Sequence, residues 1–205
     1  MNLWRLHPVP FPDVSAHADD FEALIDVTPQ GAAVEYTLDA PRWWFLHHLI
    51  RCGYVLHGSN NPRIDDFEPR GNYDAHNVRH VEGVFASDDA IWPIYFATAD
   101  RTSEPRGLIN WCEHTRTGAR YLFALEGEPS WVDGAVYALP SHTFEATPST
   151  RELVSFVAVR PRLSVPVAPD DFPLRRKTIG FRRGESVRRV TIRHALRPFS
   201  RRAPR

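Results

Sequence analysis

Apolar residues in positions 41–53 recur with the period of an α-helix. Trp43, Leu46 and Ile50 are spaced at i, i+3 and i+7, so they fall on one face of a helix. Gly53 follows them, and glycine is common just after a helix because it adopts left-handed backbone angles at little cost. The pattern predicts one helix across this range.

The segments before this helix show two other patterns. A short helix is expected over residues 18–25. In residues 32–41 the period is two, because Val34, Tyr36 and Leu38 alternate with polar or small residues. Such alternation predicts a strand with one buried face and one exposed face.

The middle of the chain predicts two strands, a long loop between them and a helix after them. The strands are YVLHGS at residues 54–59 and GVFAS at residues 83–87, with polar residues 60–82 between them. The run DDAIWPIYFATA, residues 88–99, predicts a short helix whose positive N-terminal end is stabilised by two aspartates. Pro93 fits such a helix only near its first turn.

The second half of the chain predicts mainly β-structure. Five short apolar runs are separated by Gly, Pro, Ser and Asp: LINWCE, ARYLFAL, GAVYALP, ELVSFVAV and RLSVPV. Short β-segments in close succession favour antiparallel pairing. With the helices of the first half, they predict an α+β fold.

The formal net charge of zero conceals a division of charge along the chain. Residues 174–205 hold twelve Lys or Arg and one Glu, a net charge of +11, which leaves −11 on residues 1–173. We therefore expect a globular domain over residues 1–173 and a basic C-terminal tail over residues 174–205. Such a tail either docks on the acidic domain or attracts nucleic acid or another polyanion. The arginines expected to contact nucleic acid are Arg182, Arg183, Arg188, Arg189 and Arg193.

Composition narrows the class of protein. A chain of 205 residues with 42% hydrophobic residues can bury a substantial single core, which excludes a disordered protein. No apolar run is long enough for a signal peptide or a membrane span. Cys52 and Cys112 lack metal-ligand spacing, so we expect reduced core thiols in a cytoplasmic protein that makes no membrane contact.

A metal site is not predicted. His76 and His80 stand four residues apart in HNVRH, which on a helix would bring both imidazoles to one face. No third ligand is evident near them in the sequence. The chain also lacks a glycine-rich phosphate loop and a Ser-His-Asp arrangement.

The order of the central motifs resembles that of ADP-ribosyltransferases. LHGS on a first strand, GVFAS on a second and IYFA on a helix are similar to the core of the poly(ADP-ribose) polymerase type, over about residues 34–172. Enzymes of this type carry a His-Tyr-Glu triad across three strands, and a downstream aromatic residue sandwiches the nicotinamide of NAD. The resemblance implies an ADP-ribosyltransferase-like fold, with an antiparallel core of two small sheets and NAD as the substrate.

The resemblance also implies roles for individual residues. His57 would hydrogen-bond a ribose hydroxyl of NAD, and the backbone of Gly58 would meet the nicotinamide amide, with Ser59 beside it. Phe85 stands where the family has tyrosine, so aromatic contact is kept and a hydroxyl is lost. With Glu152 as the acid, the expected catalytic residues are His57, Phe85 and Glu152.

The acid and the remaining NAD contacts have alternatives. Glu152 opens a late apolar run, as the family's glutamate does, and is preferred over three rivals in expected turns or strand ends. These rivals are Glu126, Glu128 and Glu145. Tyr95 or Phe96 would stack on nicotinamide, and Arg70 or Arg79 could bind the pyrophosphate through a fork of donors.

The chemistry of NAD explains why so few residues would suffice. Nicotinamide leaves as a neutral base, so no general acid is needed, and the ribose passes through an oxocarbenium-like transition state. One carboxylate beside the ribose can stabilise that charge. We expect transfer of ADP-ribose to a macromolecule or to water. The alternative, favoured by Phe85, is a non-catalytic nucleotide- or nucleic-acid-binding module; an RNA 2′-phosphate transferase comes last, because no cluster of arginines and histidines is evident.

Overall fold

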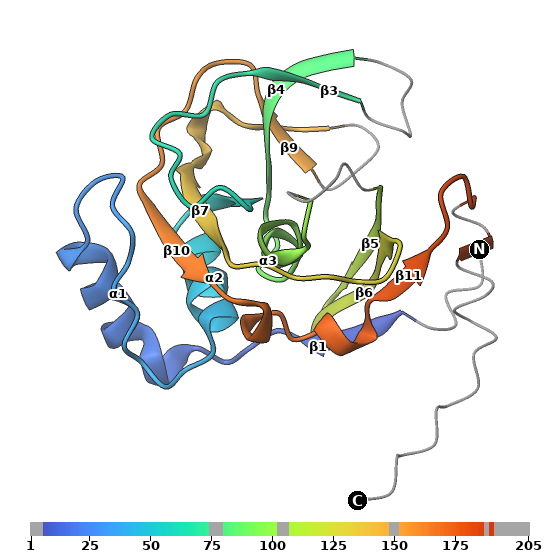
Figure 1. Cartoon of the computed structure of the whole chain (residues 1–205). Helices are drawn as coiled ribbons and strands as arrows, with labels where there is room; N and C mark the ends of the chain where they lie inside the picture. The colour runs from blue at the N-terminus through green and yellow to red at the C-terminus, as the bar shows by residue number, and fades with distance from the viewer. Residues whose placement is uncertain (1–5, 74–79, 102–106, 148–151, 187–188, 191–205) are drawn as a thin grey trace, which may run out of the picture.

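The chain folds as an α+β domain in which two open sheets lie on either side of a short helix (Figure 1). The computed structural model describes residues 6–73, 80–101, 107–147, 152–186 and 189–190. Within these residues all strand pairs but one are antiparallel. The predicted α+β class with antiparallel pairing is therefore confirmed.

The larger sheet has seven strands in the described part of the chain. Their order is β10-β7-β2-β4-β9-β8, and β3 pairs with β4 beside β2. The strands are β2 (Tyr54–Ser59), β3 (Arg70–Tyr73), β4 (His80–Ser87), β7 (Gly134–Pro140), β8 (Glu145–Ala146), β9 (Glu152–Ser155) and β10 (Leu163–Val167). The central strand β7 is buried along six consecutive residues, because both faces of the sheet are covered.

The smaller sheet is arranged around β6. Its four strands among the described residues are β1 (His7–Pro10), β5 (Leu108–Thr115), β6 (Gly118–Glu126) and β11 (Ile179–Phe181). A two-residue turn joins β5 to β6 as a hairpin. β6 also pairs with β1, and its C-terminal end pairs in parallel with β11.

The helices follow from the apolar spacing of their residues. They are α1 (Ala18–Val27), α2 (Arg42–Arg51) and α3 (Trp92–Thr98), with single 3₁₀ turns at η1 (Ser15–His17), η2 (Ser141–Thr143), η3 (Pro169–Asp171) and η4 (Arg175–Lys177). α1 buries Phe21 and Ile25, one helical turn apart, while α2 ends just before Gly53, whose φ is +89°. Pro93 lies in the first turn of α3, as predicted.

Helix α3 is the centre of the main core and contacts both sheets (Figure 1). Two glycines of the larger sheet allow this close approach. A Cβ atom on Gly58 of β2 would lie 1.8 Å from the carbonyl oxygen of Pro93, and one on Gly134 of β7 would lie 2.0 Å from that of Ala97. On the opposite side, the Tyr95 hydroxyl donates to the carbonyl of Ala124 on β6 at 2.6 Å.

Two expectations about the chain are wrong. Residues 32–41 form no strand, and only Ala33 makes a bridge, to Ser164. The boundary at residue 173 falls inside the folded domain, because β11 pairs with β6 and four residues beyond the boundary are buried. These residues are Leu174, Ile179, Phe181 and Val190.

Two further expectations concern the cysteines and membrane-spanning helices. Cys52 and Cys112 form no disulfide bond in the part of the chain that the structure describes, and Cys52 is exposed rather than part of the core. No helix in the described ranges is long and apolar enough to cross a membrane.

Candidate functional site

The three strands that carry the expected triad are neighbours in the larger sheet. β2 carries His57, β4 carries Phe85 and β9 carries Glu152, in that spatial order. On one edge, β4 pairs with β9 along residues 84–87. The sequence order of the motifs has therefore become the spatial order of three adjacent strands.

The other edge of β4 is incompletely paired. There β4 pairs with β3 along residues 80–83 and with β2 only at Ser87, opposite Leu56. Between these two stretches the carbonyl oxygen of Phe85 accepts a hydrogen bond from Nδ1 of His57, at 2.6 Å. An imidazole thus replaces a strand N–H. We call this place the β2–β4 ladder break.

The backbone of Gly58 faces the ladder break. Along a strand, alternate residues direct their N–H and C=O groups to the same edge. The carbonyl of Phe85 points to β2, so Ser87 and its partner Leu56 exchange their backbone bonds across this edge. Gly58, two residues after Leu56, then directs its N–H and C=O toward β4, beyond the last ladder pair. A planar amide could bind there by donating one hydrogen bond and accepting another.

His57 is held as a neutral side chain at this break. Burial lowers the pKa of His57; the hydrogen bond to the Phe85 carbonyl opposes this shift, and the charge of Arg101 adds to it. Because a carbonyl can only accept, Nδ1 carries the proton and Nε2 carries the lone pair. The edge of the ring packs on Phe67, with the ring centroids 4.8 Å apart.

The structure does not bring all three triad residues to one face of the sheet. Paired residues of neighbouring strands project to the same face, and successive residues alternate. Ser87 pairs with Glu152 and Phe85 with Val154, so Phe85 and Glu152 share the face that packs on α3. His57 pairs with Tyr137 and projects to the opposite face.

The rival glutamates lie elsewhere. Glu126 ends β6 of the smaller sheet, where it accepts from the N–H of Gly107 at 2.9 Å and pairs with Arg183 at 3.1 Å. Glu128 is exposed in the connection from β6 to β7, and Glu145 is exposed on the edge strand β8. Glu145 pairs with Val154, the partner of Phe85, so Glu145 and Glu152 both share a sheet face with Phe85, but only Glu152 lies on the strand next to β4.

The two aromatic candidates on α3 have different environments. Tyr95 is fully buried, its ring packs against Phe123 and Phe172, and burial raises the pKa of its hydroxyl far above the usual value. It therefore cannot stack on a ligand. Phe96 is half-buried at the edge of the core, so of the two it is the one that could form a stacking surface.

Arg101 is a candidate that the sequence analysis missed. One of its Nη atoms donates to the carbonyl of Phe96 at 2.9 Å, and its guanidinium lies 5.8 Å from the centre of the Phe96 ring. Its Nε atom is buried without a hydrogen-bond partner, and no carboxylate of the described residues forms an ion pair with it. A half-buried guanidinium without a carboxylate is a candidate anion site. Its position two residues after an expected helix gave no signal in the sequence.

Other expected contacts have less support from the geometry. Ser59 accepts a hydrogen bond from the N–H of Asn61 at 3.1 Å, which is ordinary turn chemistry. Arg70 is exposed on β3 opposite Gly83. Arg79 and His76 lie outside the described residues, and His80 begins a strand rather than continuing a helix.

The expected nucleic-acid contacts are described only in part. Arg182 and Arg189 are exposed, whereas Arg183 is exposed but paired with Glu126. Arg188 and Arg193 lie outside the described residues. A basic surface made by all five is therefore still a prediction.

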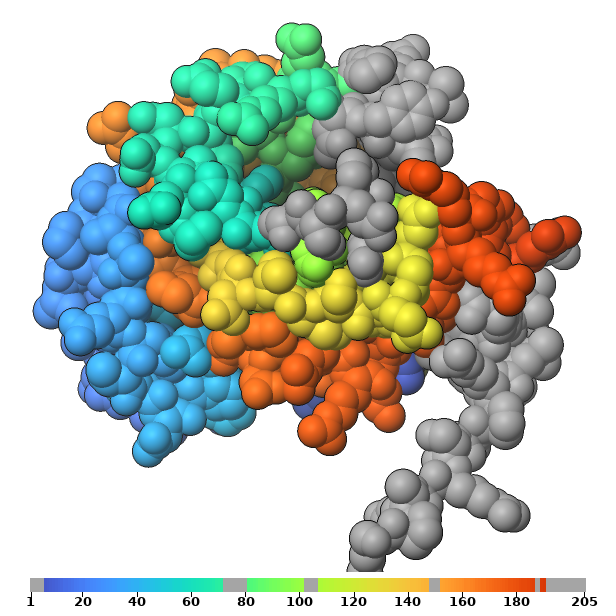
Figure 2. Space-filling model, viewed as in Figure 1, coloured from blue at the N-terminus to red at the C-terminus, as the bar shows by residue number. Residues whose placement is uncertain are grey.

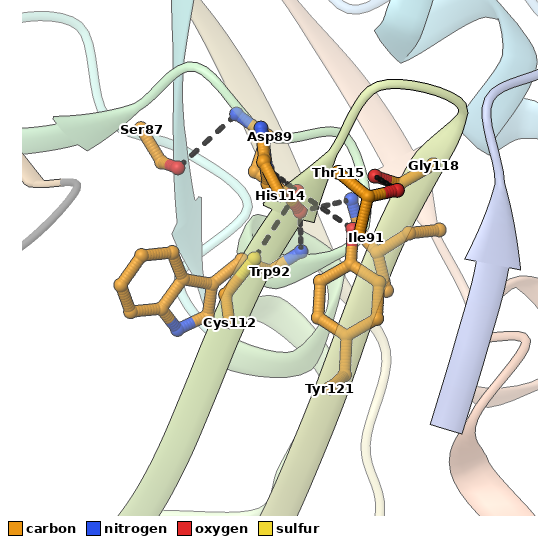
Figure 3. A network of polar contacts seen from close by, with 9 residues as sticks. All are labelled: Ser87, Asp89, Ile91, Trp92, Cys112, His114, Thr115, Gly118 and Tyr121. Atoms are coloured by element: carbon orange, nitrogen blue, oxygen red, sulfur yellow. Dashed lines mark hydrogen bonds and ion pairs between the residues drawn. The ribbon is translucent and has the colours of Figure 1, made fainter. Parts of the chain in front are cut away.

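A second polar cluster surrounds Asp89 at the start of α3 (Figure 3). One carboxylate oxygen accepts from the backbone N–H groups of Ile91 and Trp92 at 2.8 and 2.7 Å. The other accepts from Nε2 of His114 at 2.8 Å and from the Tyr121 hydroxyl at 2.6 Å. We call Asp89, Cys112, His114 and Tyr121 the Asp89 cluster.

The carboxylate of Asp89 is ionised, and both of its oxygens have hydrogen-bond partners. Burial alone would raise the pKa of Asp89, but the hydrogen bonds from His114, Tyr121 and Trp92 outweigh it and hold this pKa below its usual value. A pocket of about 110 Å³ adjoins the cluster, lined also by His47 and Phe11. Because each carboxylate oxygen already accepts at least two hydrogen bonds, the cluster fixes α3 to the smaller sheet.

Two groups of side chains could supply metal ligands among the described residues. They are Glu22 with His48 and Cys52, and Asp89 with Cys112 and His114.

Comparison with known proteins gives no relative from which to assign a family. Family models, curated proteins and solved structures all yield no match to this chain. The assignment of function therefore rests on the residues of the chain itself.

Proposed function

We propose that the chain binds NAD at the β2–β4 ladder break and cleaves its nicotinamide–ribose bond, transferring ADP-ribose to a macromolecule or to water. The observation that carries the proposal is the break itself: the backbone of Gly58 faces an edge of β4 where no ladder pair forms. A carboxamide has one donor and one acceptor side, as the N–H and C=O of a residue do.

Neighbouring groups supply the other contacts that NAD requires. Phe96 offers a ring for stacking, and Arg101 beside it offers a cation for the pyrophosphate. In Figure 2, part of the region around α3 is visible between the loop after β2 and the segment after β6. A ligand at this position would contact both sheets.

Glu152 would act on the ribose. It shares a sheet face with Phe85 and lies opposite Ser87, at the start of β9. Since nicotinamide departs as a neutral base, the chemical demand is to stabilise positive charge on the ribose, which a preorganised carboxylate can meet.

The second candidate function is NAD or nucleotide binding without cleavage. Two observations favour it: Phe85 lacks the hydroxyl of the tyrosine in the family that the motifs resemble, and His57 projects to the face opposite Phe85 and Glu152. Both candidates use the same ladder break, and they differ only in whether the glycosidic bond is broken.

One experiment separates the two candidates. The full chain is incubated with NAD that carries separate labels on nicotinamide and on adenosine, and free nicotinamide and labelled macromolecules are followed. Release by the wild type, increased in Phe85→Tyr, supports cleavage. Binding without release supports the second candidate, and neither binding nor release at millimolar NAD contradicts both.

A further inference from the structure

Three side chains with metal-binding chemistry meet where α1 and α2 lie beside each other (Figure 1). Nε2 of His48 lies 3.0 Å from Oε1 of Glu22, and Sγ of Cys52 lies 3.5 Å from the same oxygen. All three ligand atoms are within 4.8 Å of one another. We call these residues the Glu22 cluster.

The spacing of these atoms fits a tetrahedral metal ion. With zinc bonds of about 2.0–2.1 Å to nitrogen, 2.0–2.2 Å to oxygen and 2.3 Å to sulfur, neighbouring ligand atoms lie roughly 3.4–3.6 Å apart. The distances of 3.0 and 3.5 Å from Oε1 of Glu22 to the other two ligand atoms are close to these values, so small side-chain rotations would admit an ion. A histidine, a thiolate and a carboxylate are the donors that zinc prefers.

The local fold holds the cluster in place. His48 is buried in α2, and its ring packs against Phe21 of α1, with centroids 5.5 Å apart. Cys52 caps α2 one turn later, and its N–H donates to the carbonyl of His48. Glu22 and Cys52 are exposed, so an ion can enter from solvent.

The Asp89 cluster is a poorer site, although it also offers a carboxylate, a thiol and an imidazole. Both oxygens of Asp89 are filled, by two backbone N–H groups and by the side chains of His114 and Tyr121. A metal ion there would have to displace the Tyr121 hydroxyl from a buried carboxylate. In the Glu22 cluster, the hydrogen bonds described for Glu22 come only from the two other candidate ligands.

We propose that Glu22, His48 and Cys52 bind one zinc ion that joins α1 to α2. Three protein ligands leave the fourth tetrahedral position for water or an external donor, on the exposed side of the cluster. The ion would link positions that are 26 and 30 residues apart in the sequence, so it would stabilise the packing of α1 on α2. This site is separate from the β2–β4 ladder break and does not depend on NAD.

The test uses Co²⁺, which replaces Zn²⁺ in such sites and absorbs light by charge transfer when a thiolate binds it. Co²⁺ is titrated into the metal-free full chain, and then Zn²⁺ is added as a competitor. We expect a thiolate band that saturates at one ion per chain and is lost when zinc is added. At free zinc a hundredfold above its dissociation constant, the melting temperature should rise by about 5–11 °C.

Matched cysteine variants assign the site. Cys52→Ser should lose the band, and Cys112→Ser should keep it. Glu22→Gln should weaken Co²⁺ binding at least roughly tenfold, because even the loss of a group that only supports a metal ligand typically costs about 10- to 100-fold in affinity. Cys52 and Glu22 are exposed, so these substitutions leave the core intact. The proposal is overturned if the wild type shows no band, or if the band survives Cys52→Ser.

Discussion

The Asp89 cluster and the β2–β4 ladder break are both polar regions beside α3, but their hydrogen bonding differs. Each oxygen of Asp89 accepts at least two hydrogen bonds. Beside the break, Arg101 is bonded to one carbonyl, and its buried Nε has no partner. A satisfied buried charge stabilises the fold, whereas an unsatisfied one costs stability unless a ligand completes it. The comparison therefore supports a structural role for the first region and the proposed binding role of the second.

The largest effect is expected on the stability of the protein, when the hydrogen-bonded Asp89 cluster is disrupted. Asp89→Ala leaves two backbone donors of α3 and the Tyr121 hydroxyl without an acceptor. Removing one member of a buried charged network costs about 3–5 kcal/mol of unfolding free energy, which urea titration measures. Asp66→Ala, which removes an exposed pair with Arg160, is the control and should cost less than about 1 kcal/mol. Equal losses in the two variants would remove the distinction between the regions.

The second-largest effect is expected on the rate of nicotinamide release, with little change in the stability of the protein. Glu152→Gln keeps the size of the side chain and removes its charge, so NAD binding should change little. Nicotinamide release should fall by about 10²–10³, as for other preorganised groups aimed at transition-state charge. If the variant releases nicotinamide at the wild-type rate, the carboxylate that acts on the ribose is not Glu152.

Arg101→Met should weaken NAD binding without destabilising the protein. Hydrogen bonds to charged groups contribute about 1.5–3 kcal/mol, so the dissociation constant should rise roughly 10- to 150-fold. The unfolding free energy should stay equal or increase, because a half-buried cation without a carboxylate is replaced by an apolar chain. Arg160→Met, at an exposed arginine paired with Asp66, should leave NAD affinity unchanged. A large loss of stability in Arg101→Met would instead make Arg101 a structural residue.

The smallest effect is a pH dependence of stability that originates at His57. Its pKa in the folded chain lies below the 6.5 of an ordinary histidine, so between these two values the unfolded chain binds more protons and stability rises with pH. As pH falls below 6.5, this group should remove up to about 1.4 kcal/mol per pH unit. His57→Gln should reduce that slope, measured from urea midpoints between about pH 7.5 and 5.

His47 supplies the matched comparison for this slope. Burial lowers its pKa too, so its contribution has the same sign, and His47→Gln removes that part alone. If only the His47 variant changes the slope, folding does not lower the pKa of His57, and burial does not favour its neutral ring.

The spacing of apolar residues correctly predicted elements that form without a particular partner strand elsewhere in the chain. The helix at residues 41–53 was found because its apolar spacing and terminal glycine are properties of the segment itself. Val34, Tyr36 and Leu38 alternate in the same way as a strand, but they line an extended segment that has only a single bridge, at Ala33. Alternation of apolar and polar residues indicates that one side of a segment is buried, but it does not show whether the segment pairs with another strand.

Long-range contacts account for what the sequence did not predict. β11 is three residues long and lies in a strongly basic segment, so only its pairing with β6 and its burial reveal it. The partners of Asp89 at positions 114 and 121 lie 25 and 32 residues away, and nothing in the sequence joins them. Tyr95 and Phe96 are adjacent on one helix, and only the position of that helix between two sheets decides which ring is buried.

The most direct test of the account is a calorimetric titration of NAD into the wild type, Phe96→Ala and Tyr95→Phe. We predict that the wild type binds NAD and that Phe96→Ala binds it roughly 5- to 150-fold more weakly, because base–aromatic stacking contributes about 1–3 kcal/mol. Tyr95→Phe should retain wild-type affinity, since the ring stays in the core and only the hydroxyl bond to Ala124 is lost. Absence of NAD binding by the wild type, or equal affinity of Phe96→Ala and the wild type, would contradict the assignment of the ladder break as an NAD site.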